Sequence, residues 1–344
     1  MADTGLFLNN LRGISDAEMI ALAQRADALG YHSLWTGESW GRDAFTVLTM
    51  IACHTSSLRL GTGIVTVFSR TPALIAQSIA SLDLLSQGRA ILGLGTSGRI
   101  VIEDWHGLPY HRPLARTREY VEIIRQALAG GPVNYQGDLF RLGRFRLGAP
   151  PEQQRIPIYL ASLGPKNLRL TGEVADGWLP IWVHQGQLPE SIEKVAQAAT
   201  DAGRDLSQIT VAPQISCWAA DTPEELAEGE RLIRAHMAYY IGGMGSYYYN
   251  LFRRSGYEAE ADASREAWAG GQREKAAEAI SQDMVDNIAI LGDAASCRAK
   301  LDRFRRNGAD LPIIAFPHGS HLPAIQRTID ALAPERTSEP DPVS

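Results

Sequence analysis

Residues 90–99 read AILGLGTSGR, and this stretch separates two fold classes. Gly93, Gly95 and Gly98 spell G-x-G-x-x-G directly after an apolar run, which is the fingerprint of a Rossmann loop that binds a dinucleotide pyrophosphate. In a Rossmann fold the loop opens a helix, and an acidic residue closes a second strand about 20 positions later. Here the chain continues RIVIEDWHGLPYHRP, which has no helical period, and the region near residue 118 has a helical pattern. The sequence therefore favours another role for these glycines.

Strand-like and helix-like segments alternate along the whole chain. Ser15 and Glu18 predict a capping box at the start of the first helix, Gly30 predicts its end, and Pro72 predicts the start of the helix 72–88. The strand-like runs are 4–10, 33–38, 58–67, 90–97, 156–162, 176–182, 209–220 and 311–317. Further helices are predicted over 43–55, 114–129, from Pro165, over 187–203 and over 294–307.

This alternation predicts an α/β fold with parallel strands and helical crossovers. Eight such runs fit a (β/α)8 TIM barrel with insertions, and AILGLGTS is then its fourth strand. A doubly wound sheet in two lobes is the alternative. We expect one barrel domain over 1–335, a short hairpin excursion in 131–149, a helical insertion over about 222–290 between strands seven and eight, and a flexible tail over 336–344.

Composition limits the function classes. The 344 residues carry a net charge of -6, 45% hydrophobic and 21% charged residues, which is typical of a soluble globular protein and not of a nucleic-acid binder. The start MADTGLFLNN has no signal-peptide pattern, and no apolar run has membrane-spanning length. The three cysteines are far apart, so we expect reduced thiols in the cytoplasm, and no metal-ligand spacing is present.

Polar and small residues follow several of the predicted strands. Glu38 ends the second strand in WTGESW, two glycines interrupt the third in GTGIVT, and Thr96 and Ser97 follow the fourth. The fifth is followed by SLGPKN (162–167), which places a glycine and free amides at a helix start, a good seat for a phosphate. Because barrel active sites lie at the carboxyl ends of the strands, these segments suggest a flat polycyclic cofactor with a phosphate tail.

Three segments carry a family resemblance that covers nearly the whole chain. They are LGTGIVTVFSRTPALIAQSIASLDLLSQGRAILGLGTS (60–97), IYLASLGPKNLRLTGEVADGWLP (158–180) and AYYIGGMGSYYYNLFRRSGYEAEA (238–261). The chain resembles the bacterial luciferase-like oxidoreductases and, within them, the branch that depends on coenzyme F420, a deazaflavin. The third segment is similar to a smaller subgroup of that branch. The resemblance implies a barrel with insertions and a homodimer.

The resemblance also implies roles for individual residues. A cis peptide on strand three, against the middle ring of the cofactor, falls between Gly63 and Ile64. Glu38 is implied at the polar edge of the ring or at the substrate, although a helix-start carboxylate or an ion pair is its structural alternative. The remaining implied cofactor contacts are Thr66, Thr96, Ser97, Leu163, Gly164, Lys166 and Asn167. Backbone capping is the alternative for the hydroxyl residues, and a solvated helix position is the alternative for Lys166.

The chain departs from better-known members of this branch at two positions. Ser39 stands where many have a histidine, and Gly98 stands where the sugar-phosphate dehydrogenases have a glutamate. We therefore expect no sugar-phosphate dehydrogenase, and we assign Glu38 with Ser39 as the catalytic candidates. Weaker candidates for proton transfer are His106, His111 and His184, and the tyrosines 239, 240 and 247–249 are expected to pack a core or to line a substrate pocket.

Three functions remain open on these grounds. The first is an oxidoreductase that transfers a hydride from reduced F420 to an activated C=C or C=N bond of a small molecule. The second is a flavin mononucleotide (FMN) monooxygenase on the same barrel. The third is a cofactor-binding barrel without catalysis, which the residues at positions 39 and 98 keep open.

Overall fold

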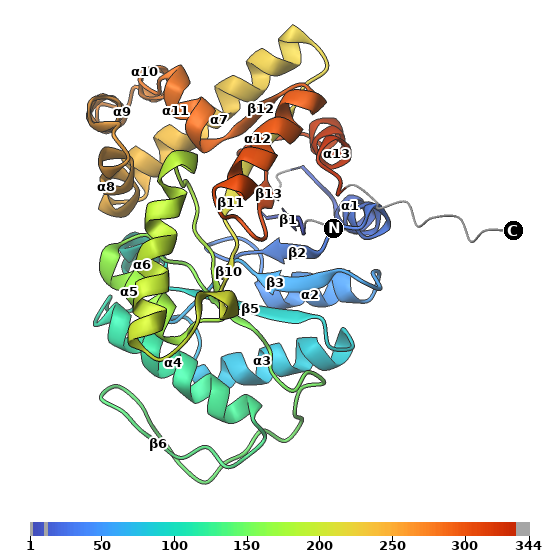
Figure 1. The fold of residues 1–344 in the computed structure, drawn as a ribbon, viewed down its shortest axis with the longest axis vertical. Coiled ribbons are helices and arrows are strands. Elements are labelled where there is room, and N and C mark those ends of the chain that lie inside the picture. Colours follow the sequence, from blue (N-terminus) through green and yellow to red (C-terminus); the bar gives the residue numbers. More distant parts are fainter. Residues whose placement is uncertain (1–2, 10–12, 335–344) are drawn as a thin grey trace, which may run out of the picture.

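Parallel strands follow one another around a ring in the computed structural model, which describes residues 3–9 and 13–334 (Figure 1). The main sheet has eleven strands, and all of its pairs are parallel. Its barrel strands are β1 (Gly5–Phe7), β2 (Ser33–Thr36), β3 (Arg59–Thr62) continued by β4 (Val65–Thr66), β5 (Ala90–Gly95), β8 (Ile158–Leu160), β9 (Gly177–Trp178), β10 (Thr210–Val211) continued by β11 (Gln214–Ala219), and β13 (Ile313–Ala315).

Strand pairs at two positions complete the closed barrel. The last barrel strand pairs with the first, with Gly5 opposite Ile313. The seventh strand is interrupted at Pro213, so that β10 pairs with β9 and β11 pairs with β13. A bridge between Ile181 and Gln214 joins the two sides of this interruption. The predicted (β/α)8 barrel is therefore confirmed, and the doubly wound alternative is wrong.

Large side chains and glycines alternate inside the barrel. The interior core consists of Trp35, Ile91, Tyr159, Leu179, Ala212, Leu311 and Ile313, with Phe7 and Ile64 against it. A Cβ atom on Gly61 would lie 2.2 Å from the Trp35 ring, and one on Gly177 would lie 2.5 Å from the Tyr159 ring. The two glycines therefore make room for the two rings, which fill the barrel below its mouth.

Helices cover the outside of the barrel. They are α1 (Asp16–Leu29), α2 (Ala44–Ala52), α3 (Pro72–Leu85), α4 (Pro113–Leu128), α5 (Pro165–Val174), α6 (Leu188–Asp201), α12 (Ala294–Arg306) and α13 (Leu322–Ala331). Figure 1 shows α2, α3 and α4 outside β2, β3 and β5. The capping box of Ser15 and Glu18, the left-handed Gly30 at φ 83° and the helix start at Pro72 are as predicted.

The helical insertion follows β11 and gathers on one side of the barrel (Figure 1). It consists of α7 (Pro223–Gly243), α8 (Ser246–Arg254), α9 (Glu258–Ala269), α10 (Arg273–Glu278) and α11 (Gln282–Ile288). The excursion between α4 and β8 contains the predicted hairpin, β6 (Tyr135–Gln136) with β7 (Arg141–Leu142). The expected tail over 336–344 lies outside the described residues.

Two elements differ from the prediction. The strand β12 (Ile290–Gly292) follows the insertion and pairs with β11, although the sequence suggested only helix up to residue 290. The segment Val101–Trp105, which has no helical period, forms one wide π-helical turn after β5. Both are short and depend on tertiary contacts, so their local patterns are weak. No helix in the described ranges 3–9 and 13–334 is long and apolar enough to cross a membrane.

Candidate cofactor and substrate site

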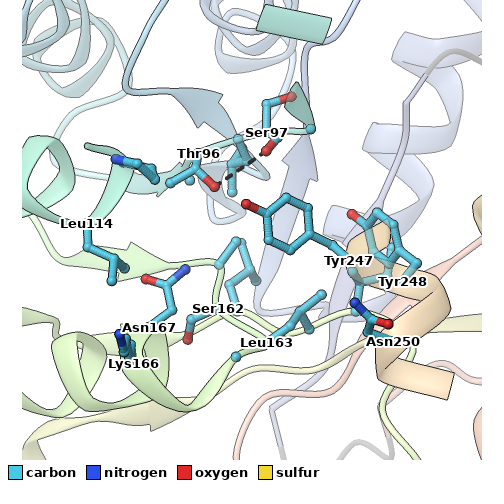
Figure 2. Close-up of a pocket in the computed structure, with 18 of the residues that line it drawn as sticks. Thr96, Ser97, Leu114, Ser162, Leu163, Lys166, Asn167, Tyr247, Tyr248 and Asn250 are labelled. Atoms are coloured by element: carbon cyan, nitrogen blue, oxygen red, sulfur yellow. Dashed lines mark hydrogen bonds between the residues drawn. The ribbon is translucent and has the colours of Figure 1, made fainter. Parts of the chain in front are cut away.

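A cavity of about 610 Å³ lies at the carboxyl ends of β4, β5, β8 and β9. The start of α4, the start of α5 and one face of α8 complete its walls. Figure 2 shows Tyr247 and Asn250 of α8 across the cavity from Lys166 and Asn167, with Thr96 and Ser97 above them. The lining residues are Ile64, Gly95–Gly98, Tyr110, Pro113, Leu114, Ala161–Asn167, Leu179, Ile181, Tyr247, Tyr248, Asn250 and Arg254.

The two halves of strand three are joined by a bulge. Gly61 pairs with Ile91 and Val65 pairs with Leu94, so this strand contains one more residue than β5 over the same span. The peptide bond inside the bulge, between residues 63 and 64, is cis, as the resemblance implied. A bulge re-aims the side chains next to it, and here Ile64 lines the cavity.

The bulge explains the first glycine of the motif. The hydroxyl of Thr62 donates to the carbonyl of Gly93 at 2.8 Å and accepts from its N–H at 2.8 Å. A Cβ atom on Gly93 would lie 1.8 Å from the carbonyl oxygen of Thr62, which leaves no room for any side chain. Gly95 and Gly98 line the cavity instead. The motif therefore shapes a barrel strand and its mouth, and it is not a Rossmann loop.

The start of α5 is open toward the cavity. Gly164 is the residue before the first turn, no side chain caps it, and a Cβ atom there would meet nothing within 4 Å. The next residue, Pro165, has no N–H, and Lys166 and Asn167 follow it in the cavity wall. An uncapped helix start carries unsatisfied N–H groups and a partial positive charge.

The charges that line the cavity all have one sign. Lys166 and Arg254 are its cations, and neither makes an ion pair with a carboxylate among the residues that the structure describes. Of the described residues that line it, none is an aspartate or a glutamate. With the start of α5 alongside, this arrangement favours a ligand with at least one negative charge.

Tyrosines border the other end of the cavity. The hydroxyl of Tyr247 lies 3.5 Å from that of Tyr110, and burial raises the pKa of Tyr110 above its usual value. Burial raises the pKa of Tyr248 to about 12. The hydroxyls of Tyr110 and Tyr248 are therefore neutral near pH 7. Ser97, in the same cavity wall, has a left-handed backbone at φ 56°, which non-glycine residues adopt only where their surroundings hold them.

The structure brings seven of the predicted residues to the cavity and leaves four outside its lining. The seven are Ile64, Thr96, Ser97, Leu163, Gly164, Lys166 and Asn167. Gly63 precedes Ile64 in the bulge, Ser39 is half-buried, and Thr66 is buried with a hydroxyl that has no partner among the described residues.

Glu38 is the fourth of these, and it occupies the position that we gave as its structural alternative. Its carboxylate forms an ion pair with Arg70 and accepts a hydrogen bond at 3.1 Å from the N–H of Ala44, the first residue of α2. Arg70 also pairs with Asp43. The backbone N–H of Glu38 donates to the carbonyl of Ile64 at 3.2 Å, so the carboxylate is held near the bulge without lining the cavity.

The tyrosine run is divided between the two roles we considered for it. Tyr247 and Tyr248 line the cavity, whereas Tyr240 and Tyr249 pack against the hydrophobic core of the insertion, and the hydroxyl of Tyr249 donates to Asp262 at 2.6 Å. None of the described histidines lines the cavity; the Nδ1 atom of His184 accepts from a local backbone N–H, and burial lowers its pKa.

Several residues of the cavity wall were not predicted from the sequence. Tyr110, Asn250 and Arg254 come from the loop after β5 and from the insertion. Asn250 and Arg254 are spaced by four residues from each other and continue the face of Tyr247, which is a signal for one helix face. This spacing does not show whether the helix face is turned toward the barrel mouth or toward solvent.

Comparison with known proteins identifies the family. A sequence model described as luciferase-like monooxygenase matches residues 8–311. The chain belongs to the luciferase-like monooxygenase family. The resemblance drawn from the sequence is thereby confirmed.

Named relatives within the luciferase-like family are similar over most of their length. A Mycobacterium tuberculosis protein provisionally named a coenzyme F420-dependent oxidoreductase is 34% identical over 318 residues, which cover 87% of this chain and 89% of that protein. The 5,10-methylenetetrahydromethanopterin reductase of Methanolobus tindarius is 30% identical, covering 86% of this chain and 89% of the reductase. The solved F420-dependent tetrahydromethanopterin reductase of Methanopyrus kandleri has a TM-score of 0.81 at 24% identity, covering 96% and 98% of the two chains. That structure shows the shared luciferase-like fold.

Proposed function

We propose that this chain is an oxidoreductase that transfers a hydride from reduced coenzyme F420 to an activated C=C or C=N bond of a small molecule. One observation carries the proposal: a cavity at the barrel mouth joins an uncapped helix start, and two cations without an ion pair among the described residues, to the bulge at residues 63 and 64. An anionic tail fits the helix start and the two cations, and a flat ring fits the wall formed by the bulge. The F420-dependent relatives support the choice of cofactor.

The cavity residues fit both the phosphate end and the ring end of coenzyme F420. The phosphate would be held by Leu163, Gly164, Lys166 and Asn167. A Cβ atom on Gly164 would meet nothing within 4 Å, and Lys166 makes no ion pair with a described residue. Ile64 would pack against the ring, with Gly63 behind it. Thr96 and Ser97 offer hydroxyls along the path between them, and the unpartnered hydroxyl of Thr66 lies on the same strand as the bulge.

When bound, reduced F420 supplies a hydride, and the protein supplies position and a proton. The bulge fixes the wall at the ring end, and the packed interior below it excludes water from that side. Glu38, held by Arg70 and by the N–H of Ala44, is our candidate to donate the proton or to orient a water that does, with Ser39 beside it.

The choice of cofactor is tested by titration. We expect the purified protein to bind F420 more tightly than FMN and to consume no oxygen with any substrate it accepts, because a deazaflavin has carbon where a flavin has the nitrogen next to its oxygen-reactive carbon. Fluorescence titration and an oxygen electrode measure the two quantities. Tight binding of FMN with substrate-dependent oxygen uptake would establish a monooxygenase instead, and cofactor binding without turnover would leave a binding protein.

The phosphate seat is tested by Gly164→Asp. The new carboxylate would stand beside the anion at the start of α5 and would occupy the open space there. We expect F420 affinity to fall by about tenfold or more, a loss of about 1.4 kcal/mol, and the affinity of its phosphate-free ring fragment to stay the same. Gly164→Ala is the matched control, since its Cβ meets nothing within 4 Å. Equal losses for F420 and the fragment would place the phosphate elsewhere.

We also propose that the enzyme is a cytoplasmic homodimer. Its cysteines Cys53, Cys217 and Cys297 are free thiols, which supports a reducing compartment. Three leucines of α3, at positions 74, 84 and 85, are exposed, and such apolar positions suit a contact with a second chain.

A further inference from the structure

Four rings meet at the barrel mouth beside the cavity: Trp182 after β9, His236 and Tyr240 on α7, and His318 after β13. Together with Ser216, which the strand register of β11 places on the same side of the barrel, we name them the mouth cluster. Trp182 directly follows Ile181, which lines the cavity and pairs with Gln214, two residues before Ser216. The cluster therefore covers the side of strands six to eight, opposite the bulge of strand three.

Ring contacts join the mouth cluster to the cavity wall. The Trp182 ring lies edge-on to the rings of His236 and Tyr240, with centroids 5.0 and 5.3 Å away. The His236 ring lies 4.0 Å from that of His318. Tyr240 meets Tyr248, a cavity-lining residue, at 4.5 Å. The cluster is thus one ring away from the space where the cofactor is proposed.

The mouth cluster holds an unusual set of buried polar atoms without partners. Trp182 is 2% exposed, and its Nε1–H donates to nothing among the described residues. Ser216 is 6% exposed, and its hydroxyl has no partner there either. The same holds for both ring nitrogens of His236. Native proteins pair almost all such atoms, so several in one place point to a ligand that pairs them.

The chemistry of these atoms describes the ligand. The indole offers a donor, the hydroxyl offers a donor and an acceptor, and a neutral imidazole offers one of each. Burial and the neighbouring His318 lower the pKa of His236 well below its usual value, so this ring is neutral near pH 7. A site of this kind suits an uncharged polar group and disfavours a phosphate or a carboxylate, which the other end of the cavity attracts.

We propose that the mouth cluster is the substrate subsite of this enzyme and binds the carbonyl, imine or hydroxyl group of a neutral substrate. The inference rests on the proposed function, because the ring end of the cofactor lies between this subsite and the bulge. It assigns Trp182, Ser216 and His236 to substrate binding and leaves Lys166 and Arg254 to the cofactor. It thereby divides the mouth into an anionic-ligand half and a neutral-ligand half.

The probe for this subsite is 2-cyclohexen-1-one, a neutral enone. Protein with ¹⁵N-labelled tryptophan is loaded with oxidised F420, which cannot reduce the probe, and is titrated while the indole N–H signals are recorded. The Trp182 signal, assigned with Trp182→Phe, should move on binding, and the signal of the exposed Trp105 should stay. Ser216→Ala and His236→Phe should each weaken probe binding by about tenfold and leave F420 affinity unchanged.

The outcomes separate this inference from the proposed function. If the probe does not bind, moves only other indole signals, or binds both variants as tightly as wild type, the subsite is wrong and ordered water pairs these atoms. If wild type fails to bind F420, the proposed function is wrong. In that case the same titration without F420 still tests the subsite through the Trp182 signal.

Discussion

Gly93→Ala is expected to destabilise the protein by about 3 kcal/mol or more, a large share of the 5–15 kcal/mol typical of a folded domain. The added Cβ atom would lie 1.8 Å from the carbonyl oxygen of Thr62 and 3.3 Å from the side chain of Leu179. Relief requires β3 and β5 to move apart, which breaks the two hydrogen bonds between Thr62 and Gly93. Urea unfolding followed by circular dichroism measures the loss.

Gly131→Ala is the control for this experiment. A Cβ atom at position 131 would meet nothing within 4 Å, so its unfolding midpoint should stay close to that of wild type. If Gly93→Ala also unfolds at the wild-type midpoint, then glycine does not set the spacing of the two strands. The bulge would in that case owe its geometry to the residues around 63 and 64.

Glu38→Gln is expected to slow turnover of an enone substrate by about a hundredfold or more while F420 binds normally. Hydride addition leaves an anion that must be protonated, and the carboxylate of Glu38 is held near the bulge where that addition is proposed. Glutamine keeps the size and the hydrogen bond from Ala44 but removes both the acid and the charge. Single-turnover rates and F420 fluorescence measure the two effects separately.

Asp43→Asn is the matched control, because Asp43 is the other partner of Arg70 and asparagine can still cap α2. A slow Glu38→Gln beside a fast Asp43→Asn would assign the proton step to Glu38. Equal losses in the two variants would mean that Glu38 acts only by holding Arg70. A wild-type rate in Glu38→Gln would exclude it from the proton step, and His106 and His184 would then be the next residues to replace.

The barrel could be predicted because its signals are local. Apolar runs of strand length, helix caps such as Ser15 and the proline starts at Pro72 and Pro165 are all read within a few residues. The strand β12 could not be predicted in this way, because its three residues are strand only through their pairing with β11. The interruption of strand seven at Pro213 likewise depends on which neighbour each half meets.

The site was predictable where strand ends supply it. Parallel strands deliver their carboxyl ends to one rim, so Thr96, Ser97 and the Leu163–Asn167 segment had to lie near one another. The insertion obeys no such rule, and Arg254 reaches the cavity only through the packing of α8. The ion-pair partner of Glu38 could not be predicted from the sequence either. Arg70 follows Glu38 by 32 positions, with a helix and two strands between them.

The packing of Trp35 and Tyr159 inside the barrel affects the order in which ligands bind and leave. Gly61 and Gly177 pack against the two rings, and together they fill the barrel interior, so the described residues leave no passage along the barrel axis. Every molecule that reaches the inner end must arrive and depart through the same rim. If F420 and a substrate share that rim as we propose, the one seated deeper arrives first and departs last, which gives an ordered reaction in which exit of the outer molecule precedes exchange of the inner one.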